Sequence, residues 1–406
     1  MRRSSGLKIL LLHNFYREPG GEDGVVMQEK ALLEARGHSV DLFSVSNNSF
    51  SGLLNTVSVA CGTVYSRKSR RLVQQKIASF RPDVVHVHNF FPQLSPSVYY
   101  ACQASHVPVI QTLHNFRLIC PNALLFREGK PCEDCVGRSF AWPGVMHACY
   151  RGSRAGTTVL ASMLTAHRLW GTWRKRVDAY IALSDFAQNK LIAGGVPASR
   201  LFVKPNCLLP DPGVRRESAD FALFVGRLSP EKGIKTLLAA WSRLQGRNLK
   251  IVGDGPLRNA VEKEHANIEF VGRRSSEAVL ELIGAAAFLI LPSECYENFP
   301  RVIVEAFAKG VPVLGSRLGS PEELIADGRT GLLFRPGDAE DLSIKAEWLF
   351  THPHELKGMS QAARKEFEFK YTADRNYERL IEIYHSAMEV SHQRSAQSNV
   401  RSRTIN

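Results

Sequence analysis

Two glutamates in the second half of the chain have the spacing and setting of a ligand-binding pair. Glu297 and Glu305 are eight residues apart, after an apolar run at residues 285–291 and before the apolar residues 311–314. This order predicts strand, turn, helix and strand, with both acids beside the carboxyl edge of a parallel sheet, where ligands bind. Each carboxylate can accept hydrogen bonds from a pair of hydroxyls, which suits a nucleotide sugar. The alternative is that both acids only complement a helix dipole.

Two cations lie near a second predicted strand end. Arg227 and Lys232 flank the turn after the predicted strand at residues 221–225, and Gly233 opens the next helix. Cations at a helix amino terminus attract a diphosphate, and they could stabilise charge on a departing nucleoside diphosphate without a metal. The alternative is a surface ion pair between Arg227 and Glu231.

These segments carry a family resemblance. Gly-Arg-Leu-Ser-Pro-Glu-Lys-Gly at 226–233, Gly-Asp-Gly-Pro-Leu at 253–257 and the glutamate pair resemble the retaining glycosyltransferases of family 4. Matching segments extend from about residue 8 to about residue 384. The resemblance implies an α/β protein with the GT-B fold, in which two doubly wound, Rossmann-like domains with parallel sheets face a cleft.

The resemblance also implies an activity. It is metal-independent transfer of a hexosyl group from a nucleoside-diphosphate sugar to a hydroxyl of a glycan or lipid-linked glycan, with retention. Cell-surface polysaccharide or lipopolysaccharide biosynthesis is the expected setting. No acid in these motifs is evidently placed as a nucleophile, and the likeness suggests front-face attack in which the leaving diphosphate accepts the proton.

Residue roles follow from the same resemblance. Glu297 would hold hydroxyls of the transferred sugar and Glu305 the ribose, while the amides at Asn298 and Phe299 approach the sugar or the phosphate. The family commonly has glycines where this chain has Asn298 and Pro300. Proline has no N–H to donate, so one backbone contact must be missing or moved.

Two glycine-containing turns are further candidates for donor binding. Gly20 and Gly21 follow the first predicted strand, where their unhindered backbone can approach a ligand closely. Gly253 and Gly255 follow the predicted strand at residues 249–252 and precede a helix expected from Pro256, so we interpret them as a wall of the nucleotide site. Either turn could instead be ordinary helix-entry geometry.

A histidine is expected to face the cleft from the first domain. His114 ends the predicted strand at residues 107–113, in the position of a family motif whose following acid is here Asn115. It could hydrogen-bond the sugar or the incoming hydroxyl, so we assign it a catalytic role beside Glu297, Arg227 and Lys232. His88 and Asn89 end another strand and are acceptor-side candidates.

Four of the eight cysteines lie in one irregular stretch, at Cys120, Cys132, Cys135 and Cys149. One short Cys-x2-Cys spacing with two outlying cysteines is compatible with a structural zinc site, to which His147 could contribute. Buried free thiols are the alternative, and disulfides are not expected in a reducing cytoplasm.

Length and composition are consistent with a two-domain enzyme. The chain has 406 residues, more than a single core usually serves, with 44% hydrophobic and 22% charged residues. The longest uncharged apolar stretch, at residues 282–292, is too short to span a bilayer. We interpret the apolar segment near the N-terminus as the first strand and expect a cytoplasmic protein.

The formal net charge is +13. Basic clusters at residues 67–71 and 168–176, the second with interleaved tryptophans, suit an anionic membrane surface at its inner face. A solvated basic helix face is the alternative. No groove-reading motif or aromatic RNA platform accompanies the charge, which excludes nucleic acid as the expected partner.

The pattern of strands and helices predicts where the domains divide. Prolines at 205, 210 and 212 mark a linker, so an acceptor-side domain is expected at residues 1–207 and a nucleotide-sugar-binding domain at 208–372. A helix at 373–390 would cross back onto the first domain. Residues 391–406 are polar and aperiodic, which predicts a disordered tail.

Two other classes of protein fit the sequence less well. A nucleotide-sugar epimerase of the same fold would need an acidic and histidine-rich set, which is not evident. A non-catalytic nucleotide-sugar-binding subunit would be expected to have lost one of five residues that this chain retains: His114, Arg227, Lys232, Glu297 and Glu305.

Overall fold

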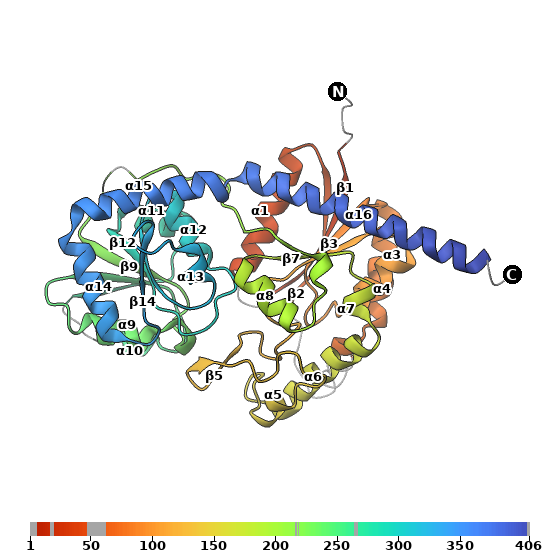
Figure 1. The fold of residues 1–406 in the computed structure, drawn as a ribbon, viewed down its shortest axis with the longest axis horizontal. Helices are drawn as coiled ribbons and strands as arrows, with labels where there is room; N and C mark the ends of the chain where they lie inside the picture. The colour runs from red at the N-terminus through yellow and green to blue at the C-terminus, as the bar shows by residue number, and fades with distance from the viewer. Residues whose placement is uncertain are drawn as a thin grey trace. The chain divides into compact units, whose positions relative to one another are not determined.

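The computed structural model describes residues 6–16, 20–46, 62–215, 217, 219–263 and 267–403 (Figure 1). These residues form two compact units. The first unit comprises the described residues within Met1–Ala123, Glu133–Lys204 and Asn376–Asn406. The second comprises those within Leu124–Cys132 and Pro205–Arg375. The main division, after Lys204, is close to the boundary that the sequence predicts after residue 207.

The first unit is built on a six-stranded parallel sheet in the order β2-β1-β3-β4-β7-β8. Its strands are β1 (Lys8–Phe15), β2 (Ser39–Ser46), β3 (Val84–Asn89), β4 (Val109–Thr112), β7 (Ala179–Ala182) and β8 (Leu201–Val203). Ile9, Leu10, Leu11 and Leu12 of β1 are fully buried, as expected for a central strand covered on both faces. The short β8 was not predicted from the sequence.

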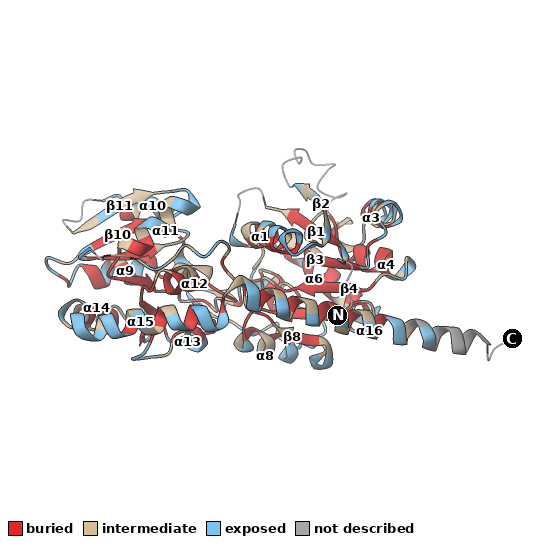
Figure 2. Ribbon diagram, turned by 90° about the horizontal axis from the view of Figure 1, so that it is seen from above, coloured by how far each residue is buried: buried red, intermediate tan, exposed pale blue. Residues whose placement is uncertain are grey.

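Helices connect these strands and cover the sheet. They are α1 (Gly21–Ala35), α3 (Arg67–Phe80), α4 (Ser97–Ala104), α5 (Trp142–Met146), α6 (Arg154–Leu169), α7 (Thr172–Lys175) and α8 (Asp185–Ala193). Ser66, Ser153 and Ser184 accept hydrogen bonds from backbone amides at the starts of α3, α6 and α8. These serine caps satisfy amides that have no partner within the helix. Figure 2 shows buried strands beneath helices whose outer faces are exposed.

The last helix, α16 (Ala373–Arg403), contributes most of its length to the first unit. Leu380, Ile383, Tyr384 and Ala387 are buried. The sequence predicts a disordered tail from residue 391, whereas α16 continues to Arg403 in the structure. The helix stays anchored there by Arg394, whose Nη1 lies 2.7 Å from the buried Oδ1 of Asp178.

The second unit has a sheet of the same kind, in the order β11-β10-β9-β12-β13-β14. Its strands are β9 (Phe221–Val225), β10 (Asn248–Val252), β11 (Ile268–Gly272), β12 (Phe288–Leu291), β13 (Val313–Ser316) and β14 (Gly331–Phe334). All of the neighbouring strands are parallel. The predicted fold class, α/β with two doubly wound parallel sheets, is confirmed.

Helices of the second unit pack around this sheet. They are α9 (Ile234–Trp241), α10 (Arg258–Val261), α11 (Ser276–Ala285), α12 (Arg301–Ala308), α13 (Ser320–Leu324), α14 (Ala339–Thr351) and α15 (Pro353–Lys370). Trp241 anchors the core among residues of β9, β10, β12 and α14. Residues 124–132 add an unpredicted hairpin of β5 (Phe126–Arg127) and β6 (Lys130–Pro131). No helix in the described ranges is both long and apolar enough to cross a bilayer.

Candidate functional site

The order of strands brings the two main motifs of the second unit together. β9 and β12 are hydrogen-bonded neighbours and run parallel, so their carboxyl ends meet at one edge of the sheet. Lys232 lies in the loop after β9, and Glu297 lies in the loop after β12. Residues 65 positions apart are thereby placed at one point, as the sequence predicted for ligands at such an edge.

Lys232 and Glu297 form a partly buried ion pair. The Nζ atom of Lys232 lies 2.5 Å from Oε1 of Glu297, and Oγ of Ser293 donates to the same oxygen at 2.6 Å. The two side chains are only 27% and 12% exposed. Burial raises the pKa of Glu297, but the charge of Lys232 and the two hydrogen bonds outweigh it and leave the pKa below its ordinary value. The carboxylate is therefore ionised and held in one place.

The rest of the Glu297 loop leads into α12. Pro300 is the residue before its first turn, and Glu305 lies within the helix, 3.6 Å from Arg301. Burial raises the pKa of Glu305, and the charge of Arg301 only partly offsets this. The carbonyl of Asn298 accepts a hydrogen bond from Oγ of Ser320 at 2.7 Å, which fixes the loop backbone.

The loop after β9 places its two cations differently. Arg227 is exposed, whereas Lys232 turns inward to Glu297. Glu231 accepts a hydrogen bond from Oγ of Ser229 at 2.6 Å, and the alternative ion pair between Arg227 and Glu231 does not form among the described residues. Arg227 is left available to an anionic ligand.

Three glycines let backbone segments of this edge approach one another. Gly233 has φ +69°, and a Cβ there would lie 1.8 Å from the carbonyl oxygen of Pro292. A Cβ on Gly253 would lie 1.8 Å from the carbonyl oxygen of Gly226, and one on Gly255 would also meet backbone. The Gly253 turn therefore has a structural reason for its glycines, apart from any contact with a nucleotide. Its helix begins at Arg258, later than the expected Pro256.

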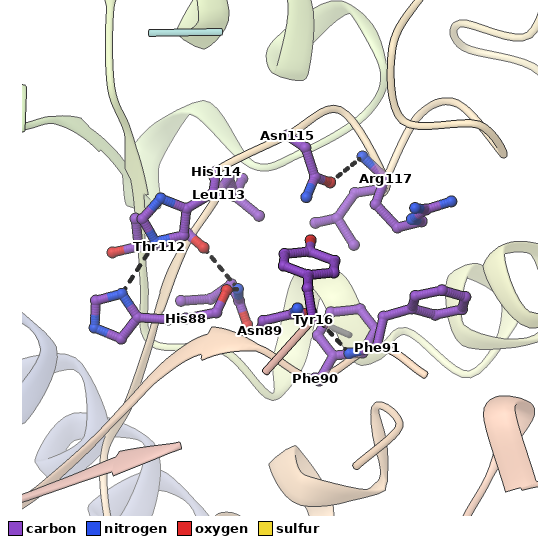
Figure 3. Close-up of a pocket in the computed structure, with 12 residues that line it drawn as sticks. Tyr16, His88, Asn89, Phe90, Phe91, Thr112, Leu113, His114, Asn115 and Arg117 are labelled. Carbon is purple, nitrogen blue, oxygen red and sulfur yellow. Dashed lines mark hydrogen bonds between the residues drawn. The ribbon is translucent and has the colours of Figure 1, made fainter. Parts of the chain in front are cut away.

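The first unit holds a pocket at the carboxyl ends of β3 and β4 (Figure 3). Its lining includes Tyr16, Asn89, Asn115 and Arg117 together with both predicted histidines, His88 and His114. Nδ1 of His88 lies 3.0 Å from Nε2 of His114, and the two rings stack. The structure thus joins the predicted catalytic histidine to a predicted acceptor-side residue. The side-chain amide of Asn89 instead donates to the backbone of Asn14 at 2.9 Å.

Arg117 forms one side of this pocket and was not singled out in the sequence. Its guanidinium carbon lies 4.5 Å from the ring centre of Phe91 and 5.5 Å from that of Tyr150. Nη1 also donates to the carbonyl of Pro121. A planar cation held against aromatic rings, next to histidine and asparagine side chains, forms a polar pocket with apolar walls, a type that suits sugars.

A carboxylate beneath the pocket was also missed. Oε1 of Glu29 lies 2.9 Å from Nδ1 of His86 and 3.2 Å from Nε2 of His88. Its Oε2 lies 3.3 Å from Nζ of Lys204, which is itself buried. Among the described residues, Glu29, His86 and His88 form the one group with three ligand atoms close enough to hold a metal ion. Because Lys204 already neutralises Glu29, the group is satisfied without an added cation.

The four cysteines proposed as zinc ligands form no such group in the described chain. Sγ of Cys120 donates to the side chain of Asn122 at 2.9 Å, and none of the described cysteines forms a disulfide. The geometry therefore gives the zinc interpretation of Cys120, Cys132, Cys135 and Cys149 no support, since one short spacing does not gather four thiols.

The glycine turn of the first unit precedes α1. The amide of Gly20 donates to Oδ2 of Asp23 at 2.9 Å, and a Cβ on Gly20 would meet nothing within 4 Å. Gly21 is the first residue of α1, and Pro19 lies outside the described residues. Beside this turn, the hydroxyl of Tyr16 donates to Oε2 of Glu22 at 3.0 Å. The space around Gly20 is consistent with close approach of a ligand.

Two protein-family models match the chain. Residues 19–210 match the model described as Glycosyltransferase Family 4, and residues 210–366 match the model described as Glycosyl transferases group 1. The site of the second unit lies within residues 210–366, and the pocket of the first unit lies within residues 19–210 except for Tyr16. Together the models account for most of the chain and for both units.

Individual proteins show the same similarity. A sulfoquinovosyl transferase (SQD2) of Arabidopsis thaliana is 24% identical over 309 residues, which are 74% of this chain and 56% of that protein. A GDP-mannose-dependent alpha-mannosyltransferase of Mycolicibacterium smegmatis is 32% identical over 270 residues, 63% of this chain and 62% of that protein. The chain thus spans less than two thirds of the length of these relatives. Anabaena Alr3699/HepE, solved in complex with UDP, is similar in fold, with a TM-score of 0.64 at 18% identity over 94% of this chain and all of that one.

Proposed function

The chain belongs to the family 4, group 1 glycosyltransferases and has their GT-B fold, and from this premise we propose the reaction that it catalyses. It is a nucleotide-sugar-dependent glycosyltransferase. The proposed reaction transfers a hexosyl group from a nucleoside-diphosphate sugar to a hydroxyl of a glycan or lipid-linked glycan, with retention of configuration and without a catalytic metal.

The observation that carries this proposal is the ion pair between Lys232 and Glu297 at the edge of the second sheet. A diphosphate beside Lys232 would gain a cation that is already oriented, and the exposed Arg227 would supply a second. Glu297 would accept hydrogen bonds from hydroxyls of the sugar, and Glu305 would accept hydrogen bonds from hydroxyls of the ribose. Preorganised charges of this kind stabilise a departing diphosphate more in the transition state than in the ground state.

Retention without a protein nucleophile agrees with the geometry of Glu297. Its Oε1 accepts hydrogen bonds from both Lys232 and Ser293, so these contacts hold the carboxylate from one side. A group held in this way is suited to binding hydroxyls rather than to moving onto an anomeric carbon. The departing diphosphate would accept the proton of the incoming hydroxyl, as front-face attack requires.

In the first unit, His114 would accept a hydrogen bond from a hydroxyl of a sugar bound in its pocket. Arg117 and its aromatic neighbours would contact the sugar ring. His88 and Asn89 would support this acceptor-side region. The backbone at Gly20 and Gly21 would approach the donor phosphate, as the open space around Gly20 permits.

The surface of the first unit supports a membrane-linked acceptor. Leu169 is 79% exposed and Trp170 is 51% exposed, and Trp142 and Met146 of α5 are exposed as well. Exposed basic residues accompany them at Arg67, Lys68, Arg71, Arg174 and Lys175. Apolar and basic side chains on one unit fit an anionic lipid surface. We therefore propose a peripheral protein at the cytoplasmic face of a membrane, acting in polysaccharide or lipopolysaccharide biosynthesis.

The test is a donor screen with purified protein, nucleotide sugars of the UDP and GDP types, and lipid extract as the acceptor. We expect released nucleoside diphosphate and labelled lipid for at least one donor, and the same rate in EDTA. Glu297→Ala and Lys232→Ala should lose turnover, whereas the exposed Glu281→Ala and Lys235→Ala should retain it. Full turnover by Glu297→Ala, or a changed sugar without transfer, as an epimerase would give, would refute the proposal.

A further inference from the structure

A line of buried polar groups in the first unit leads from Lys204 to the pocket. Lys204, Glu29, His88 and His114 follow one another at distances of 3.3, 3.2 and 3.0 Å. Lys204, Glu29 and His88 are at most 5% exposed, and His114 lies at the pocket end of the line. Figure 3 shows the bond between the two imidazoles. Because water is excluded from the line, each group must obtain its hydrogen-bond partners from its neighbours.

Lys204 keeps Glu29 ionised, and Glu29 in turn determines which nitrogen of His88 carries a proton. Lys204 is a buried ammonium, and besides Glu29 its Nζ contacts the amide oxygen of Asn376 at 3.1 Å. A buried ammonium requires a counter-charge, so Glu29 is a carboxylate. Burial alone would raise the pKa of Glu29, but its interactions with His86, Lys204 and His88 hold it well below its ordinary value. A carboxylate only accepts hydrogen bonds, so the nitrogen of His88 that faces it must carry a proton.

The tautomer of His88 then determines that of His114. Burial lowers the pKa of His88 to about 4, so this imidazole is neutral near pH 7. With its proton on Nε2 toward Glu29, the Nδ1 atom of His88 is a bare acceptor. Nε2 of His114 lies 3.0 Å from that acceptor and must donate to it. Burial also keeps the pKa of His114 well below its ordinary value, so His114 carries this one proton and no other.

We infer that Glu29 and His88 are positioning residues that hold His114 in the tautomer protonated on Nε2, with Nδ1 as a bare acceptor for a ligand hydroxyl. In Figure 3 the second nitrogen of the His114 ring lies on the side away from His88. The tautomer follows from the contacts of this unit alone, whereas the identity of the hydroxyl as that of a sugar rests on the proposed function. His114 would then recognise donors of a hydrogen bond and discriminate against carbonyl or ether groups at the same position.

The surrounding groups do not compete for these protons. His13 lies beside His88, with 6.5 Å between ring centres, but its Nε2 is bonded to Asp23 at 2.7 Å. His86 stacks on His88, and its Nε2 is bonded to Oγ1 of Thr112 at 2.7 Å. Its Nδ1 faces Glu29 and the hydroxyl of Tyr384. The bond to His114 is therefore supplied by His88 alone among these histidines.

Nitrogen NMR of the full chain labelled with 15N-histidine tests this inference without turnover. Long-range proton–nitrogen spectra report which ring nitrogen is protonated, and the His114 signals are assigned by their absence in His114→Gln. We expect wild-type His114 to show a protonated Nε2 and a bare Nδ1 at pH 7. In His88→Gln, where the amide nitrogen replaces Nε2 toward Glu29 and no group replaces Nδ1, we expect a mixture of both tautomers.

The matched control is His86→Gln, which removes an imidazole from the same carboxylate but none from His114. Its His114 signals should keep the wild-type pattern, which shows that loss of a buried ring does not by itself change the tautomer. A protonated Nδ1 in the wild type, or an unchanged pattern in His88→Gln, would overturn the inference. Where the tautomer behaves as expected and no donor is turned over, the inference stands and the proposed function fails.

If transfer is detected, kinetics add a second readout. His88→Gln should lower kcat/KM for transfer about 3- to 10-fold, because one neutral hydrogen bond to the ligand is weakened. His86→Gln should stay within about 2-fold, because His86 does not line the pocket and its loss removes no hydrogen bond of His114. Equal losses in both variants would assign the effect to packing and would contradict the positioning role.

Discussion

The two units organise polar side chains in opposite ways. In the second unit, Lys232 and Glu297 are ionised partners at the edge of the sheet, and Arg227 adds a further exposed cation. In the first unit, burial lowers the pKa of His88 and of His114, and the opposite charges of Lys204 and Glu29 lie together beneath them. The second site is thus suited to a charged ligand, whereas the first is suited to neutral hydroxyls.

This difference indicates how one reaction could be divided between two similar sheets. An anionic diphosphate requires cations that are fixed before it arrives, and a carboxylate holds Lys232 in that state. A neutral sugar has no charge to pair with a cation, so its hydroxyls are better recognised by hydrogen-bond donors and acceptors of fixed orientation. The predictions below test this division, beginning with the change of largest expected effect.

Lys232→Met should be the most damaging change. It removes a preoriented cation and leaves Glu297, which is 12% exposed, without its counter-charge. We expect kcat to fall on the order of 100- to 1,000-fold, as for loss of one preorganised group in other active sites. The steady-state rate of nucleoside-diphosphate release at saturating donor measures kcat. Lys235→Met, on the exposed face of α9, is the control, and a loss below 10-fold would show that the second site does not depend on charge.

The glycine turns of the two units should respond differently to a methyl group. Gly233→Ala forces φ +69° on an alanine and places its Cβ against the carbonyl oxygen of Pro292, so we expect a loss of about 2 to 3 kcal/mol in unfolding free energy. Gly20 has φ −116°, and a Cβ there would meet nothing within 4 Å, so Gly20→Ala should lose less than about 0.5 kcal/mol in unfolding free energy. Urea unfolding measures both. Equal losses would remove this contrast between the turns.

Two glutamates should have opposite pH effects on stability. Burial raises the pKa of Glu22 to about 8, above the 4.5 of an unfolded glutamate, and the hydrogen bond from Tyr16 only partly offsets it. The ionised form is therefore disfavoured in the folded state, and stability falls as pH rises from about 4.5 to about 8. The pKa of Glu297 is lowered, so its stabilisation is present above its ordinary pKa and is lost in acid.

Glu22→Gln should remove the first of these effects. The unfolding free energy of the variant relative to the wild type should rise by about 1 to 2 kcal/mol between pH 5 and pH 9. Urea unfolding at both pH values measures this difference. Glu297→Gln should show the reverse trend, with its deficit growing as pH rises through the ordinary range of a carboxyl. A pH-independent difference for Glu22→Gln would place that carboxyl in water.

Much of the fold could be predicted because its signals are local. Buried parallel strands appear as short apolar runs, such as 221–225, and prolines mark the linker near Pro205. The motif residues Lys232 and Glu297 follow such strands, so their meeting at one edge was predictable once the strands were assigned.

The parts that were missed depend on contacts between distant residues. Glu29 and Lys204 are separated by 175 positions, and neither lies in a recognisable motif. In the last helix, Arg394 contacts Asp178, which is 216 positions away, whereas the local composition of this segment predicts disorder. The cysteine spacing was a local signal without a matching tertiary arrangement.

The smallest effect is expected for His114→Gln. A neutral hydrogen bond contributes about 0.5 to 1.5 kcal/mol, so we expect kcat/KM to fall only about 3- to 10-fold. His385→Gln, exposed on α16, is the control and should match the wild type. Salt separates this loss from that of Lys232→Met, because screening weakens ionic contacts with a charged donor and leaves a neutral contact unchanged. Raising the ionic strength should therefore reduce the advantage of the wild type over Lys232→Met but not its advantage over His114→Gln. A loss for His114→Gln that shrank with salt would show that this imidazole acts as a cation, and the contrast between the two sites would then be wrong.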